Sequence, residues 1–260
     1  MKAEKIIQNL ENSCPPMFAL DWDNSGLLCG HKDADIKKIV VAVDATDDVV
    51  DFAIKNGADM IITHHPLILK GLKRVTDSDF IGKRILKLAE NKIVLYSMHT
   101  NFDVAVMADE AADILDLSNR SILEETYSDS VSKEGIGRIG MLPKSMTLKE
   151  CAQFVKNQFH IDNVMVFGPL NKKIDIVAVC PGSGKSVTDI AIRSGAQLLI
   201  TGDIGHHTGI DCVSRGLCVI DASHYGLEKI FVDYIKDFLE SAYPEIKILS
   251  GKQKEPFVVI

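Results

Sequence analysis

The sequence predicts an α/β protein built from two related α/β lobes, and three observations support this prediction. Short runs of β-branched residues alternate with amphipathic segments, which is typical of parallel strands joined by helices. The pattern that starts near residue 39 returns near residue 174. Side chains of the kind that bind ligands follow several predicted strands, at the edge where open α/β sheets place their sites.

Length and composition restrict the classes of protein to consider. The 260 residues suffice for one large domain or two modest ones, and 46% hydrophobic with 25% charged residues is typical of a globular chain with a core. The formal net charge of -7, without a local stripe of Lys and Arg, argues against direct nucleic-acid binding. The apolar runs fall short of the ~20 residues of a membrane helix, so we expect no membrane segment.

The cysteines and the N-terminus indicate a cytoplasmic protein. The 6 cysteines contain no C-x-x-C pair, so we expect free thiols in a reducing compartment and no cysteine-based zinc site. The charged start Met1-Lys2-Ala3-Glu4-Lys5 lacks the apolar core of a signal peptide.

In the first half, helical spacing predicts a helix over residues 2–13, ended by two prolines, and a polar turn around Trp22 follows. Residues 39–43 form a β-branched run without alternation, which indicates a buried strand. Thr46 can cap a helix that stops at Gly57, and a second buried strand covers residues 60–63. Such a strand-helix-strand unit with short joints predicts parallel strands.

The chain then predicts a helix over 80–90, a strand over 92–96 and a helix over 108–115. Residues 118–135 are polar and lack periodicity, so we expect an exposed connection between the lobes. The expected division is therefore a first lobe over 1–117, on which some C-terminal elements pack, the connection over 118–135, and a second lobe over 136–260.

In the second half, the glycines of Gly135–Gly140 indicate a strand with close backbone approach, followed by an amphipathic helix over 147–159. Strands are expected over 164–167 and 174–180.

An internal repeat relates the two halves. The segment Ala53–Thr63 matches Ala191–Thr201 at a constant offset, since 191 − 53 = 138 and 201 − 63 = 138. The alternative is chance likeness between two strand-helix-strand units, and the shared Gly-Ala turn followed by an apolar run and Thr argues against it. The halves differ where chemistry is expected, because Gly202-Asp203 stands at the position of His64-His65.

Three predicted strand ends carry side chains that can bind a metal. His64 and His65 follow one strand, and His99 with Asp103 follow another. Near the third, Ser223 can cap a helix on which His224 and Glu228, four residues apart, share one face. Imidazoles and carboxylates suit Zn, Fe or Mn better than Ca or Mg. Two ions about 3.5–4 Å apart would use such a ligand set fully.

Each candidate also has an ordinary structural interpretation. His64 and His65 can be loop histidines, His224 and Glu228 a surface helix pair, and Asp103 the cap of a turn. For His99 we favour a supporting or structural role over direct ligation. For His206 and His207 we favour a helix start or the rim of a pocket.

The stretch Pro181–Ser186 resembles a phosphate-binding loop without matching it. The motif requires glycine five places before Gly184, and that position is Val179. We therefore reject nucleotide-triphosphatase function, although backbone amides at this strand-to-helix joint can hold an anion.

Taken together, the motifs resemble those of the Nif-three-like family, whose members are often labelled GTP cyclohydrolase 1 type 2 homologues. The matching stretches span nearly the whole chain, in order: Trp22–Leu27, Ala58–Pro66, His99–Asp103, Gly135–Gly140, Thr201–Asp203 and Asp221–Glu228. The resemblance implies duplicated α/β lobes, a dinuclear metal site in the cleft between them, and a ring-shaped homohexamer. Longer members carry a domain inserted between the halves, for which residues 118–135 leave no room.

Carried over motif by motif, the metal ligands implied by the resemblance fall on His64, His65, Asp103, His224 and Glu228. We place His99, Tyr225 and Asp203 around the ligands; the family usually has Glu at the position of Asp203, which leaves its role open. These residues predict a metal-dependent hydrolase of a nucleotide or related small molecule, GTP cyclohydrolase-like by its family label. The alternatives are a non-enzymatic metal carrier or insertase, and a regulatory interaction protein.

Overall fold

A computed structural model describes residues 1–260 and shows a mixed α/β protein with two sheets. The chain forms two compact units. The first unit comprises Met1–Phe102 and Phe231–Lys254, and the second comprises Asp103–Ile230 and Glu255–Ile260. The expected division was 1–117, 118–135 and 136–260, with some C-terminal elements packed on the first lobe. In the structure, residues 103–117 belong to the second unit, and Phe231–Lys254 belong to the first. The helices are all too short or too polar to cross a membrane.

The first unit contains a five-stranded sheet in the order β1-β4-β3-β2-β11. Its strands are β1 (Gly26–Cys29), β2 (Lys38–Ala42), β3 (Met60–Thr63), β4 (Val94–Ser97) and β11 (Lys247–Ser250). Neighbouring strands are parallel except for β1, which runs antiparallel to β4. The predicted parallel pairing of the strands over 39–43 and 60–63 is confirmed, with Ile39 opposite Met60.

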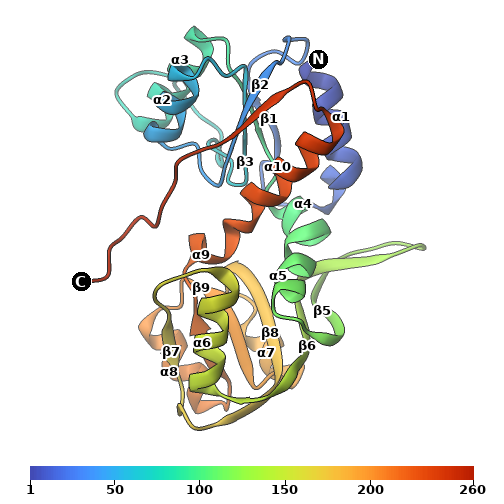
Figure 1. Ribbon diagram of the computed structural model, residues 1–260, viewed down its shortest axis with the longest axis vertical. Helices are drawn as coiled ribbons and strands as arrows, with labels where there is room; N and C mark the ends of the chain where they lie inside the picture. Colours follow the sequence, from blue (N-terminus) through green and yellow to red (C-terminus); the bar gives the residue numbers. More distant parts are fainter. The chain divides into compact units, whose positions relative to one another are not determined.

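Helices cover both faces of this sheet (Figure 1). On one face lie α2 (Asp47–Lys55) and α3 (Phe80–Glu90), and on the other lie α1 (Ala3–Ser13) and most of α10 (Ile230–Ala242). Alternate strand residues such as Val40 and Ile61 pack with Val49 of α2 and Leu88 of α3. The predicted cap of α2 is present, because the Thr46 hydroxyl accepts a hydrogen bond from the backbone N–H of Val49.

The second unit contains a six-stranded sheet in the order β5-β6-β8-β9-β10-β7. Its strands are β5 (Ser118–Ser128), β6 (Lys133–Thr147), β7 (Met165–Phe167), β8 (Lys173–Ser183), β9 (Leu198–Gly202) and β10 (Cys218–Asp221). The central strands β8, β9 and β10 are parallel. On one face pack α5 (Ala108–Ile114) and α6 (Leu148–Phe159), and on the other α7 (Thr188–Arg193) and α8 (His206–Ser214).

Residues 118–135, expected as an exposed connection, are largely exposed but form regular β-structure. This segment forms β5 and the start of β6, an antiparallel hairpin whose turn is held by Asp129 accepting hydrogen bonds from the N–H groups of Val131 and Ser132. Only Leu123 of β5 is buried, so the strand carries no apolar pattern that would reveal it. The close backbone approach predicted nearby is present, since a Cβ at Gly135 would lie 2.0 Å from the carbonyl oxygen of Glu124.

The two strand-helix-strand segments have the same internal register. In β2-α2-β3, Ile39 lies opposite Met60, and in β8-α7-β9, Val177 lies opposite Leu198. Both partners are displaced by the same number of residues, since 177 − 39 = 138 and 198 − 60 = 138. In each segment a left-handed glycine, Gly57 at φ 61° or Gly195 at φ 80°, turns the chain from the helix into the next strand.

Candidate metal centre

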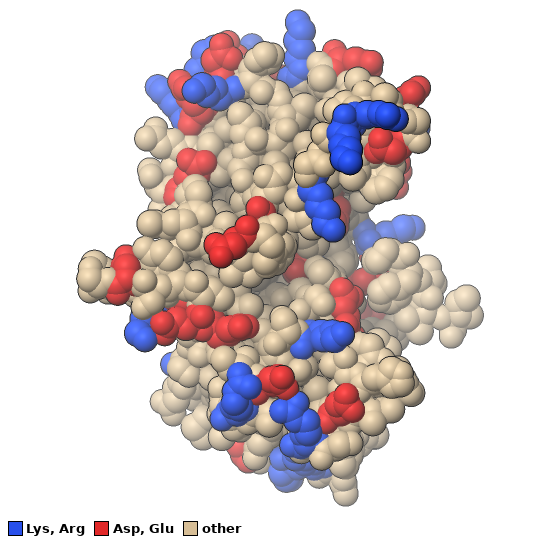
Figure 2. All heavy atoms as spheres, turned by 180° about the vertical axis from the view of Figure 1, so that it is seen from behind, with Lys and Arg blue, Asp and Glu red and all other residues tan.

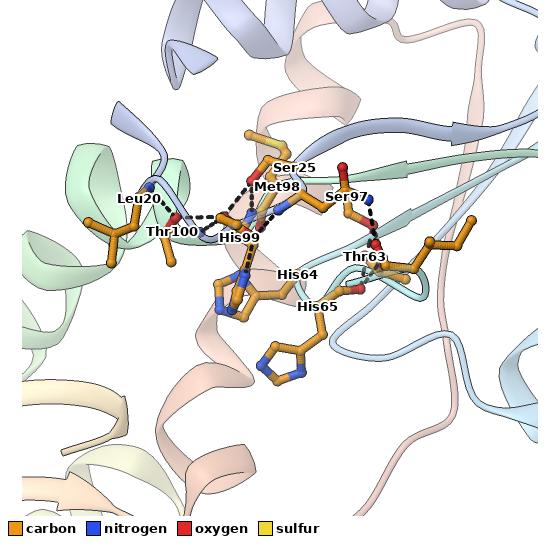
Figure 3. A network of polar contacts seen from close by, with 12 residues as sticks. Leu20, Ser25, Thr63, His64, His65, Ser97, Met98, His99 and Thr100 are labelled. Atoms are coloured by element: carbon orange, nitrogen blue, oxygen red, sulfur yellow. Dashed lines mark hydrogen bonds and ion pairs between the residues drawn. The ribbon is translucent and has the colours of Figure 1, made fainter. Parts of the chain in front are cut away.

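The ends of three parallel strands bring polar side chains together in the first unit. Ala42 of β2 pairs with Thr63 of β3, which pairs with Ser97 of β4. The residues just beyond these positions therefore share one edge of the sheet, as Figure 3 shows for the histidines. That edge carries His64 and His65 after β3, and His99 after β4.

His64, His65 and His99 form a compact cluster. Each offers one nitrogen, and these ligand atoms all lie within 4.8 Å of one another. The ring centroid of His64 lies 4.9 Å from that of His65 and 5.2 Å from that of His99. Such a spacing allows the nitrogens to converge on one ion or on two neighbouring ions. We expected a supporting or structural role for His99, and the structure places its ring centroid only slightly farther from those of the pair, at 5.2 and 5.4 Å, than the pair members are from each other.

The Nδ1 atom of each of these imidazoles has a specific hydrogen-bond partner. His64 Nδ1 lies 2.8 Å from the carbonyl oxygen of Met98, and His65 Nδ1 lies 2.8 Å from Asp44 Oδ1. His99 Nδ1 lies 2.7 Å from Asp23 Oδ1. An imidazole that donates through Nδ1 carries its lone pair on Nε2 when neutral. Proteins orient metal-binding histidines in this way, which makes Nε2 the ligating atom.

Asp23 is the buried anchor of His99. Its side chain is 0% exposed and accepts hydrogen bonds from the Thr100 N–H at 3.0 Å and the Ser25 hydroxyl at 2.8 Å. Burial by itself would raise the pKa of Asp23, but the hydrogen bonds and the charge of His99 outweigh it and hold that pKa well below its ordinary value. Asp23 is therefore a carboxylate at neutral pH, suited to orient an imidazole.

Asp44 and Asp23 contact the candidate histidines, and the sequence did not identify them. Asp44 could have been found from the parallel register, because Ala42 lies opposite Thr63 and so places Asp44 beside His65. Asp23 lies in a loop far from His99 in the chain, and nothing in the sequence indicates their pairing.

In the second unit, His224 lies between two carboxylates. Its Nδ1 lies 2.7 Å from Asp203 Oδ2, and its Nε2 lies 3.0 Å from Glu228 Oε1. His224 and Glu228 are the ends of α9 (His224–Glu228), whose predicted cap is present, since the Ser223 hydroxyl accepts the N–H of Gly226 at 2.8 Å. An imidazole nitrogen beside a carboxylate oxygen is a pair of ligand atoms that suits a divalent cation.

Glycine backbone lies directly against this histidine and glutamate. A Cβ at Gly182, after the middle of β8, would stand 2.7 Å from Glu228 Oε1, and a Cβ at Gly202 would stand 2.6 Å from the backbone nitrogen of His224. Glu228 is only 2% exposed. Gly182, within the Pro181–Ser186 stretch, therefore leaves room for the buried carboxylate of Glu228. This explains a glycine at position 182 without a phosphate-binding role.

Two non-glycine residues beside α9 have left-handed backbone, Asp203 at φ 57° and Ser223 at φ 60°. Such conformations are costly for side chains with a Cβ and are concentrated at functional sites. Both residues position His224, one through its carboxylate and the other as the cap of its helix.

The remaining predicted residues lie in the second unit. Asp103 begins the π-helix η2 (Asp103–Met107), a type of turn often found at functional sites. Burial raises the pKa of the Cys180 thiol, and the charges of Asp103, Glu124 and Glu228 raise it further. Tyr225 lies on α9, next to His224. His206 and His207 begin α8 with exposed side chains, as expected for a helix start.

Figure 2 shows one face of the molecule, on which Lys and Arg are interspersed with Asp and Glu. The formal net charge of the whole chain is -7.

The sequence is similar to that of known proteins along nearly all of its length. A family model described as Duf34/NIF3 (NGG1p interacting factor 3) matches residues 1–256. A protein of Clostridium acetobutylicum named GTP cyclohydrolase 1 type 2 homolog is 36% identical over 250 residues, which cover 95% of this chain and 93% of that protein.

Solved structures share the fold. HcgD of Methanocaldococcus jannaschii, in its reduced form, is 32% identical, with a TM-score of 0.85 over 97% of this chain and 98% of that chain. A Bacillus cereus protein related to NIF3 has a TM-score of 0.91 over 100% and 99% of the two chains, at 24% identity.

Proposed function

The chain belongs to the Duf34/NIF3 family, and on this premise we propose that it binds two divalent metal ions and uses them to hydrolyse a nucleotide or a related small molecule. The proposed ligands are His64, His65 and Asp103 together with His224 and Glu228. His99, Tyr225 and Asp203 are proposed to support them.

One observation carries the metal proposal. His64, His65, His99 and His224 each have Nδ1 within hydrogen-bonding distance of a backbone carbonyl or a carboxylate. For the three proposed histidine ligands, His64, His65 and His224, this common orientation favours ligation through Nε2, because an outer acceptor both selects the tautomer and makes the ligand more basic. An ordinary surface histidine has no need of such a partner.

The donor set also fits the proposed metals. Imidazole nitrogen and carboxylate oxygen bind Zn, Fe and Mn, and a divalent cation would offset the cost of burying a charged carboxylate at Glu228, which is 2% exposed. We propose that the first unit supplies His64 and His65, and that the second supplies Asp103, His224 and Glu228. The equal register of the two strand-helix-strand segments supports an internal duplication as the origin of the two units.

Bound metal ions would lower the pKa of a coordinated water and polarise a carbonyl or phosphoryl oxygen of a substrate. The residues of the chain then have defined tasks. Asp44 and Asp23 hold the His65 and His99 rings in place, and Asp203 does the same for His224. The name of the Clostridium acetobutylicum relative, a GTP cyclohydrolase 1 type 2 homolog, makes purine nucleotides the first substrates to test.

The test is a metal analysis coupled to an activity screen. The purified protein is expected to contain two metal ions per chain by mass spectrometry, and to turn over a member of a panel of nucleotides and phosphoesters. Asp103→Ala and Glu228→Ala should each lose metal while keeping the circular dichroism spectrum of the fold. His206→Ala is the control, and it should keep both ions.

The two parts of the proposal fail separately. Full metal content without turnover of any compound would reject the hydrolase and leave a metal-binding protein. Absence of metal after incubation with Zn, Fe and Mn would reject the site itself.

We also propose that the protein acts in the cytoplasm as a homohexamer, without direct contact with nucleic acid. Light scattering at micromolar concentration tests the oligomeric state. A monomer under these conditions would overturn it.

A further inference from the structure

The segment that follows β11 continues beside the end of β2. The parallel pairing of the two strands ends with Ser250 opposite Val41, and the N–H of Gly251 donates to the carbonyl oxygen of Val41 at 2.7 Å. Beyond this point the hydrogen bonds to the residues that follow β2 come from the side chain of Gln253 and no longer from the main chain. Its Oε1 accepts hydrogen bonds from the N–H groups of Val43 at 2.5 Å and Asp44 at 3.0 Å.

The other end of the same amide contacts the carboxylate of Asp44. Gln253 Nε2 donates to Asp44 Oδ2 at 3.3 Å, while Asp44 Oδ1 lies 2.8 Å from His65 Nδ1. The Asp44 side chain is 44% exposed, so packing alone does not fix its rotamer. Gln253 thus holds both the backbone and the carboxylate of the residue that orients His65.

Two residues further on, the same segment contacts the cap of α9. The hydroxyl of Ser223 donates to Glu255 Oε1, and its oxygen accepts the N–H of Gly226. Ser223 has left-handed backbone, so an additional bond on its side chain helps to hold an unfavourable conformation. The helix that starts there carries His224 and Glu228.

These contacts are polar and do not add to a hydrophobic core. Residues Phe257 to Ile260 are exposed, and Val258 is 83% exposed. The segment after β11 also has no regular secondary structure of its own. Specific hydrogen bonds therefore connect Gln253 and Glu255 to residues behind the histidines.

From these contacts we infer that Gln253 and Glu255 are positioning residues of the metal centre. Gln253 orients His65 through Asp44, and Glu255 orients His224 and Glu228 through the Ser223 cap. This inference rests on the proposed metal-binding function. A glutamine is suited to the first role, because its amide accepts from two N–H groups and donates to a carboxylate at once. A glutamate there would set a second negative charge beside Asp44.

The first experiment measures zinc affinity of the full chain by competition with a chromophoric chelator. Gln253→Ala and the nearly isosteric Gln253→Glu are expected to bind Zn²⁺ about 10- to 100-fold more weakly, the usual effect of losing an outer partner of a metal-bound histidine. Lys254→Ala, an exposed neighbour in the same segment, is the matched control and should bind like the wild type. Thermal unfolding of the metal-free proteins shows whether each variant is folded.

A second pair of variants tests Glu255. Glu255→Ala is expected to weaken zinc binding, whereas Glu255→Gln should restore it, because the amide oxygen can still accept from Ser223. A requirement for the negative charge of Glu255 would not give this difference, because glutamine lacks that charge.

A spectroscopic measurement separates the inference from the function on which it rests. In metal-free protein with ¹⁵N-labelled histidine, the imidazole signals of His65 should show the Nδ1–H tautomer in the wild type and a mixture of tautomers in Gln253→Ala. Unchanged zinc affinity and unchanged tautomer in Gln253→Ala would overturn the inference. Failure of the wild type to bind metal would overturn the proposed function, and the tautomer signals would still decide the role of Gln253.

Discussion

At the scale of single residues, the orientation of the histidines depends on partners that lie far away in the sequence. Asp44 and Asp23 reach His65 and His99 across 21 and 76 positions of the chain. The sequence indicated the histidines because two adjacent imidazoles after an apolar run are conspicuous. It could not indicate Asp23, because a loop aspartate is common and its pairing depends on how the loop folds over the strand end.

Replacing Gly182 by alanine should damage the metal centre specifically. Both Gly182, at φ 78°, and Gly195, at φ 80°, have left-handed backbone, so an alanine at either costs about 1 to 2 kcal/mol of stability. Only at Gly182 does the new Cβ meet Glu228, at 2.7 Å, whereas the space at Gly195 is open.

Urea unfolding and zinc titration of the two variants measure this difference. Gly195→Ala should lose stability and keep its zinc affinity, and Gly182→Ala should lose both. Equal zinc affinity in the two variants would show that Glu228 is not a ligand.

At the scale of elements, α9 depends on its surroundings. Its five residues are too few for a helix that is stable by itself, so the cap and the contacts around it maintain the helix. The cap was predictable, because serine before an i, i+4 pair is a familiar start signal. The length of α9 and the π-helix at Asp103 were not, because nothing in the local sequence specifies where regular α-helical bonding gives way.

Two helix caps allow a paired test of this dependence. Ser223→Ala and Thr147→Ala each remove a side chain that accepts from a helix N–H, at a cost of about 1 kcal/mol each. Thr147 caps α6, which carries none of the proposed ligands. The midpoint temperature of thermal unfolding should therefore fall in both variants, and zinc affinity should fall only in Ser223→Ala. Weaker zinc binding by Thr147→Ala would indicate a general loosening of the fold.

The β5–β6 hairpin shows where sequence patterns stop being informative. A strand is visible in a sequence when one face or both faces are apolar, and β5 buries only Leu123. By contrast, β2 and β3 are buried almost throughout, and their β-branched runs predicted both strands and their parallel pairing.

At the scale of the whole molecule, buried thiols make stability depend on alkaline pH. Burial raises the pKa of Cys14 from 9.0 to about 12, against a weaker opposing effect of a hydrogen bond with Ser13. Because the pKa is higher in the folded protein, the unfolded chain loses its proton first. The stabilisation is complete below about pH 9 and is lost as the pH rises from there toward 12.

At pH 10 the titration of Cys14 in the unfolded chain should lower the free energy of unfolding by about 1 kcal/mol relative to neutral pH. Urea unfolding at pH 7.5 and pH 10 measures the loss. In Cys14→Ser, whose hydroxyl does not titrate in this range, the loss should be smaller by that amount. An identical loss in wild type and variant would show that other groups govern the alkaline limb.

The order in which the two units are made follows from how the chain is divided. Residues 103–230 are contiguous. The first unit, by contrast, needs Phe231–Lys254, which supply strand β11 of its sheet and most of helix α10. During synthesis on the ribosome, the contiguous main part of the second unit, residues 103–230, thus emerges before the first unit is complete in sequence, and domains tend to fold as they emerge. The first sheet remains unfinished meanwhile, with β2 as an open edge. Gln253 emerges after every strand of the two sheets, so the final orientation of His65 is expected only after those strands have been made.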